Sequence, residues 1–129
     1  MKIEEQVLNI EQMKHLQELG VDISDASMCW VAGGNTFTDE EEWNLCIPNR
    51  YLLPYNIPTY TIGDLIEKLP KTIEIYHLMI DWNLMQIEYT NWSWQESVFR
   101  ECFTLNDKPL INTLYDCLCW VAENHKELL

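Results

Sequence analysis

The stretch DKPLINTLYDCLCWVAENHK, residues 107–126, predicts a long amphipathic helix that the rest of the fold must cover. Asp107 is the expected N-cap, and Pro109 is expected inside the first turn, where its missing N–H costs little. Apolar side chains recur at helical spacing along one wide stripe. Burying each leucine or valine of this stripe contributes roughly 1.5–3 kcal/mol before entropy is subtracted. The residues expected in the core are Leu114, Leu118 and Val121.

Two shorter helices are predicted upstream, and each has a recognisable start. Asn9 and Gln12 occupy the two positions of a capping box, and Gly20 suits the positive φ of a helix C-terminus. Thr61 and Asp64 repeat the capping-box spacing ahead of the second helix. The apolar residues that follow keep helical spacing, so each helix should present one face to the core.

A β-hairpin is predicted between these two helices. Residues 27–32 and 43–47 have the composition of paired strands, and glycines after the first strand supply turn chemistry. The four consecutive acids of residues 39–42 lack the alternation and the glycine of a calcium loop, so we interpret them as a solvated hairpin loop. Residues 48–58 contain three prolines and are expected to be an irregular connection.

Further strands are predicted before the C-terminal helix. Residues 72–81 are rich in β-forming residues, residues 85–90 alternate cleanly, and residues 97–105 are expected to add a strand, although their spacing also fits a helix. Strands that follow one another through short turns pair antiparallel. We therefore expect an α+β fold, a mainly antiparallel sheet of about four to five strands with three helices packed on one face.

The length of 129 residues indicates a single domain over residues 1–129, with residues 1–8 as a partly flexible lead-in. No apolar run reaches the ~18 residues of a membrane helix. The charged N-terminus also lacks the continuous apolar core of a signal peptide. These features predict a cytoplasmic protein that binds no membrane.

The net charge of −13, from 21 acids and 8 bases, is the most unusual property of the composition. Such a charge repels nucleic acid and anionic membranes, so no direct binding to nucleic acid is expected. Two interpretations remain open. Either the acids only keep a small protein soluble, or they are spaced like phosphates and make a DNA mimic.

The cysteines are interpreted as reduced, buried thiols, because they lie in apolar surroundings and no pair has the CxxC spacing of a metal or redox site. No metal site is predicted. The five residues are Cys29, Cys46, Cys102, Cys117 and Cys119.

No constellation of catalytic residues is recognisable. His15, His77 and His125 fall on different predicted elements, and the sequence contains no nucleophile elbow, HExxH pair or glycine-rich phosphate loop. We therefore predict no catalytic residue, no cofactor and a protein that is not an enzyme. A hydrolase assembled from scattered residues is the least favoured hypothesis.

Three tryptophans near the predicted strands are the candidates for a protein docking surface, because tryptophan is favoured at binding hot spots. The alternative is that they are buried as core beneath a loop. We expect at least one of the last two to be buried, with the other at the rim. The three residues are Trp82, Trp92 and Trp94.

Three stretches carry a resemblance to known proteins: LNIEQMKHLQELGVDISDASMCW (8–30), TYTIGDLIEKLPK (59–71) and LYDCLCWVAENH (114–125). Together they resemble a family of small uncharacterised proteins from gut bacteria of the Bacteroides group and their phages or mobile elements. The resemblance implies a phage or mobile-element setting and a single cytosolic domain. It supplies no catalytic residue.

The expected function is that of a non-enzymatic accessory protein, a protein–protein interaction module with an unknown protein partner and a possible homodimeric state. The alternative is an acidic DNA-mimic inhibitor of a host defence enzyme. The two hypotheses differ in the distribution of charge. A mimic needs its carboxylates aligned along one elongated face, whereas a solvated surface spreads them.

Overall fold

The computed structural model describes residues 3–33, 42–46, 57–81, 86–91, 96–97, 103–104 and 109–129. Within these residues the helices are α1 (Ile10–Glu18), α2 (Ile62–Lys68) and α3 (Leu110–Asn124), with 3₁₀ segments η1 (Ile3–Gln6) and η2 (Lys126–Leu128). The strands are β1 (Met28–Gly33), β2 (Glu42–Cys46), β3 (Ile57–Thr59), β4 (Thr72–Ile73), β5 (Tyr76–Asp81), β6 (Gln86–Asn91), β7 (Glu96–Ser97) and β8 (Phe103–Thr104).

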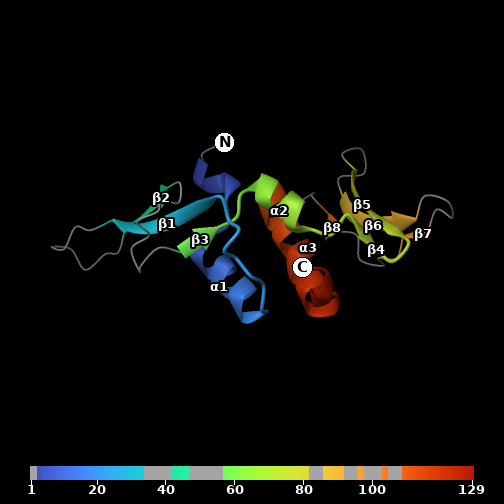
Figure 1. Cartoon of the computed structure of the whole chain (residues 1–129). Coiled ribbons are helices and arrows are strands. Elements are labelled where there is room, and N and C mark those ends of the chain that lie inside the picture. The colour runs from blue at the N-terminus through green and yellow to red at the C-terminus, as the bar shows by residue number, and fades with distance from the viewer. Residues whose placement is uncertain are drawn as a thin grey trace.

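The strands form two antiparallel sheets. One has the order β2-β1-β3, and the other has the order β4-β5-β6-β7, with β8 also paired to β6. Figure 1 shows the sheets at opposite ends of the molecule, with the three helices between them. The expected α+β class is confirmed, but the expected single sheet with three helices on one face is wrong. The helices pack both on one another and on strands of the two sheets, since α1 packs against β3 of the first sheet and α3 packs against β6 and β8 of the second.

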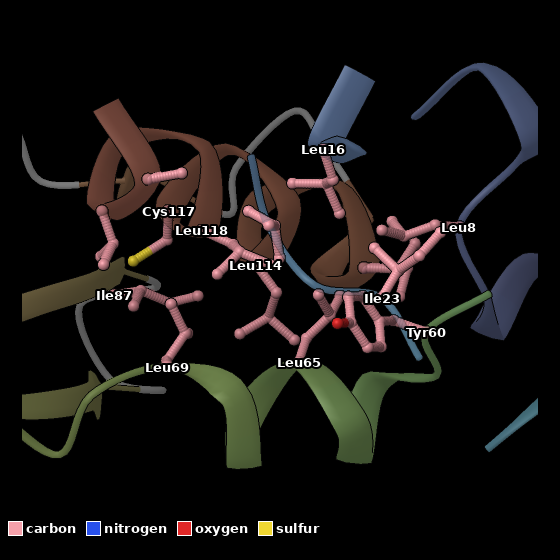
Figure 2. Close-up of a cluster of buried hydrophobic side chains, with 14 of the residues drawn as sticks. Leu8, Leu16, Ile23, Tyr60, Leu65, Leu69, Ile87, Leu114, Cys117 and Leu118 are labelled. Carbon is pink, nitrogen blue, oxygen red and sulfur yellow. The ribbon is translucent and has the colours of Figure 1, made fainter. Parts of the chain in front are cut away.

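Helix α3 is the centre of this core. It packs against α2, α1, β6 and β8. Leu114, Leu118 and Val121 are fully buried, which confirms the prediction for the stripe. Figure 2 shows Leu65 of α2 and Leu69, the residue directly after α2, pointing toward this helix. The buried side chains of α3 cover a wide arc, which is why one neighbouring element cannot cover them all.

The start of α3 differs from the prediction. Pro109 is the N-cap residue itself, with ψ 147°, and its carbonyl accepts the N–H of Asn112 and Thr113. It therefore precedes the first turn, because its backbone is extended and helical geometry begins at Leu110. The predicted cap, Asp107, lies outside the described residues.

Both ends of α1 are as predicted. The side chain of Asn9 accepts the N–H of Gln12, and the side chain of Gln12 accepts the N–H of Asn9, which completes the capping box. Gly20 has φ +86°, and it donates to the carbonyl of Gln17 while Val21 donates to that of Leu16. This pair of bonds is a Schellman motif, in which a left-handed residue turns the chain away from the helix.

Residues 7 and 8, expected in the flexible lead-in, are part of the core. Val7 forms a bridge with Thr61, and Leu8 is fully buried. The N–H of Leu8 donates to the carbonyl of Tyr60, while its own carbonyl accepts the indole N–H of Trp30 at 2.9 Å. The N-terminal segment is therefore joined both to the start of α2 and to the first sheet.

Two other predicted segments are organised differently. Residues 72–81 form two strands and not one, because the chain reverses at Glu74, which has φ +56°. The single strand expected over 97–105 is replaced by two short strands, β7, which begins one residue earlier at Glu96, and β8, and they pair with the two ends of β6.

The connection expected over residues 48–58 ends in β3, where Pro58 pairs with Cys29 at the edge of the first sheet. An edge strand tolerates proline, because the missing N–H faces away from the ladder. Alternation along β6 is as predicted, with Ile87 and Tyr89 fully buried.

Shortening Leu118 to alanine should destabilise the protein strongly. The side chain is fully buried between elements that are held in place by other contacts, so a cavity remains, and Leu118→Ala should lower the free energy of unfolding by roughly 2–5 kcal/mol. Urea unfolding measures the change. Leu128→Ala is the matched control, because Leu128 is 44% exposed. Equal effects of the two substitutions would contradict the assignment of the core.

Candidate functional site

The three tryptophans predicted as a docking surface, Trp82, Trp92 and Trp94, lie outside the described residues. Their role in docking stays a prediction. The described residues contain two other concave regions that could bind a ligand. One is polar and lies beside α2, and the other is apolar and lies where the helices begin.

The polar cavity has a volume of about 460 Å³. The Tyr60 hydroxyl lies 2.6 Å from Asp25 Oδ1 and 2.8 Å from the carbonyl oxygen of Asp22, so its single proton is held between two acceptors. The Lys68 ammonium donates to Asp25 Oδ2 at 3.0 Å and to the same Asp22 carbonyl at 3.1 Å. The residues that line the cavity are Asp25, Tyr60, Asp64, Glu67, Lys68, Lys71, Leu128 and Leu129.

The electrostatics of this cavity favour a structural role. Burial, reinforced by the nearby Asp25 carboxylate, raises the pKa of Tyr60 well above its usual range, so the hydroxyl stays protonated and acts as a donor. Lys68 and Asp25 are paired with each other. These contacts fasten the segment 21–26 to α2, and they occupy the groups that acid–base chemistry would need.

Asp64 has a similar structural role. Its Oδ2 accepts the N–H of Thr61 at 3.0 Å, the N–H of Ser27 at 3.1 Å and the Ser27 hydroxyl at 2.6 Å. Burial alone would raise the pKa of Asp64, but these hydrogen bonds outweigh it and hold the pKa below its ordinary value. The capping box was predicted, whereas the bonds from Ser27 were missed because they join residues far apart in the sequence.

Removing the Asp64 carboxylate should destabilise the protein in a pH-dependent way. Asp64→Ala should lose about 0.5–2 kcal/mol at neutral pH, the usual effect of a lost cap. Because the folded-state pKa is depressed, this contribution is complete above the ordinary value of 3.8 and is lost as the pH falls through the lower folded-state value. Urea unfolding at several pH values measures it, with the exposed Glu67→Ala as the control. A pH-independent difference between wild type and Asp64→Ala would contradict the assignment.

The apolar depression lies between η1 and the first turns of α2 and α3. Its largest part has a volume of about 340 Å³. Two smaller depressions of about 200 Å³ each adjoin it, one sharing Ile62 and the other sharing Glu5, Pro109 and Ile111. We call this region the helix-start groove and define it by Glu5, Ile62, Pro109, Leu110 and Ile111.

The groove exists because three helices begin at the same place. The side chain of Gln12, in α1, donates to Asn112 Oδ1 of α3 at 3.1 Å, and the bridge between Val7 and Thr61 brings η1 to the start of α2. The starts of α1 and α2 are closed by capping boxes. The start of α3 has Pro109, whose side chain cannot cap, and no acid in its first turn.

Sequence reasoning assigned no binding role to any of the residues that define the groove. Within its own helix each residue has a common structural position. Ile62 is the first residue after the N-cap of α2, and Leu110 is the first apolar residue of α3. The proximity of three helix starts is a tertiary feature. Pro109 was noticed only as a first-turn proline and not as part of a site.

The described cysteines and histidines do not assemble into a reactive site. Cys29 and Cys117 are buried, Cys119 is half-buried, and none forms a disulfide. Burial raises the pKa of Cys117 to about 12, so its thiol is protonated. Within the described residues no three His, Cys, Asp or Glu side chains lie close enough to hold a metal ion. The side chains of Cys46 and Cys102 lie outside the described residues.

Thiol reactivity should follow this burial. In the native protein, alkylation at about pH 8 should leave Cys117 unmodified, because almost none of its thiol is ionised or accessible. After unfolding, all five cysteines should react. Peptide mapping by mass spectrometry locates the modified residues, and stoichiometric metal analysis accompanies it. Rapid native alkylation of Cys117, or one zinc per chain, would contradict this assignment.

Comparisons with known proteins add no assignment to these observations. None of the helices in the described part of the chain is both long and apolar enough to cross a membrane. No family model, no curated protein and no solved structure matches the chain.

Proposed function

We propose that this chain is a non-enzymatic protein–protein interaction module, an accessory protein of a phage or mobile element, and that the helix-start groove binds its protein partner. The observation that carries the proposal is the groove itself, an apolar depression of about 340 Å³. Ile62 and Leu110 are partly exposed in it, beside the buried Ile111. A phage or mobile-element setting rests on the resemblance of the three stretches quoted above.

An apolar groove of this kind suits a protein partner. Burial of apolar surface contributes roughly 25 cal/mol per Å², and binding energy concentrates where one apolar anchor fills a depression surrounded by polar groups. Asn9, Gln12 and Asn112 provide such a polar rim beside the groove. The polar cavity is a weaker candidate, because Asp25 and Lys68 are paired with each other and Asp64 is hydrogen-bonded within the fold.

The distribution of charge supports an interaction module over a DNA mimic. The exposed acids of the described residues are spread over η1, α1, the segment 22–25, α2, the β4–β5 turn, α3 and η2. A mimic would need an aligned row of unengaged carboxylates. Here Asp25 is paired with Lys68, and Asp64 is hydrogen-bonded within the fold. We therefore attribute the net charge of −13 to solvation.

Replacing the apolar lining by neutral polar side chains tests the groove. The groove variant carries Ile62→Gln and Leu110→Gln, and the control Leu128→Gln changes an apolar residue that is 44% exposed elsewhere. Short peptides selected on the wild-type protein from a display library should contain an apolar anchor. Their affinity should fall at least tenfold on the groove variant, a loss of about 1.4 kcal/mol, and stay unchanged on the control.

Circular dichroism and thermal unfolding first establish that each variant is folded. A native-host pull-down then applies the same comparison to the natural partner, which should be retained by the control and lost by the groove variant. Peptides or partners that bind the groove variant as tightly as the wild type would show that binding takes place elsewhere.

A further inference from the structure

We propose that the helix-start groove accepts the β4–β5 turn, Glu74–Ile75, of a second copy of this chain. The inference rests on the proposed function, because it names the occupant of the same groove. It is carried by two features of the described residues. One is an exposed isoleucine on a turn with a positive φ, and the other is an apolar groove at whose edge α3 begins at Pro109, a residue that makes no side-chain cap.

The turn has an unusual composition for its geometry. Ile73 pairs with Tyr76, so Glu74 and Ile75 are its two central residues. Two-residue hairpin turns need a positive φ, which Gly, Asn or Asp usually supplies. Here Glu74 adopts φ +56°, and the Ile75 side chain that follows is 61% exposed. Strain at a non-glycine residue beside an exposed apolar side chain is a feature that functional sites retain.

The turn is held firmly by the core behind it. Ile73 is buried in the main cluster, and Tyr76 and Leu78 pack against that cluster. At the end of the hairpin away from the turn, the N–H of Leu78 in β5 donates to the carbonyl of Lys71, just before β4, at 2.9 Å. The Ile75 side chain is therefore presented on a fixed backbone, which lowers the entropy lost on docking.

The groove and the turn are complementary in polarity and in charge. Ile62, Leu110 and Ile111 offer an apolar lining for one branched side chain. Next to that side chain, the Glu74 carboxylate would meet the positive end of α3, where the described residues, from Pro109 onward, place no acid in the first turn and Pro109 makes no side-chain cap. Glu5 also lines the groove and opposes this attraction. Salt screens both effects, but each chain carries a net charge of −13, so the repulsion between two copies is the larger of them and salt should strengthen association.

The contact must form between copies. The β4–β5 hairpin belongs to the sheet at one end of the molecule, while the groove lies beside η1 and the starts of α2 and α3 (Figure 1). A turn in a groove buries less area than a standard interface, so the association is weak and concentration-dependent. A head-to-tail contact of this kind closes into a ring or extends into an open chain.

Sedimentation equilibrium of the full chain, up to about 1 mM in moderate salt, tests the proposal. The wild type and Leu128→Gln should associate, and association should strengthen with salt. Ile75→Ser and the groove variant should each remain monomeric. Mixed together, they should form a 1:1 heterodimer, because the turn of the groove variant can enter the intact groove of Ile75→Ser. Glu74→Gly should weaken association while raising thermal stability.

The mixing experiment separates a lost contact from a lost fold. A variant that had failed to fold would stay unassociated in the mixture too, so a restored complex shows that both variants are folded. A wild type that is monomeric at the highest concentration, or an association unaffected by Ile75→Ser, would overturn the proposal. Display peptides that still bind the groove of such a monomer would leave the proposed function standing. If the chain neither self-associates nor binds display peptides through the groove, both the proposed occupant and the proposed function are wrong.

Discussion

The structure depends on covering α3 along more than one side. Its buried residues range from Ile111 to Ala122 and include the fully buried Leu114, Cys117 and Leu118. Figure 2 shows Leu65 of α2 and the following Leu69 pointing toward this helix, while Ile87 lies beside Cys117. A helix buried over so wide an arc needs several partners, and each partner is thereby brought close to the others. The convergence of the helix starts follows from this one requirement.

The features that could be predicted are those encoded within a few residues. The capping boxes at Asn9 and Thr61 and the left-handed Gly20 are local in sequence and were found at their expected places. The β1–β2 hairpin and the alternation along β6 are local in the same sense. Each depends on spacing or on backbone preference, so the surrounding fold had little chance to override it.

Other features could not be predicted because distant residues decide them. The turn at Glu74 has no glycine or asparagine to announce it, so a strongly β-forming stretch was interpreted as one strand. The division into two sheets depends on which short strands find each other, and alternation alone does not encode that choice. For the same reason the groove, which joins Glu5, Ile62 and Leu110, has no signature within any one segment.

The main chain at Leu8 has a consequence for the time course of folding. Its carbonyl accepts the hydroxyl of Thr59, 51 residues later, and its N–H donates to the carbonyl of Tyr60. Synthesis proceeds from the N-terminus, so Leu8 leaves the ribosome long before these partners exist. Until then its apolar side chain stays exposed and the first sheet lacks its attachment to the core. Contacts between residues so far apart in the sequence form slowly. We therefore expect the hydrogen bonds of Leu8 with Thr59 and Tyr60 to form late in folding.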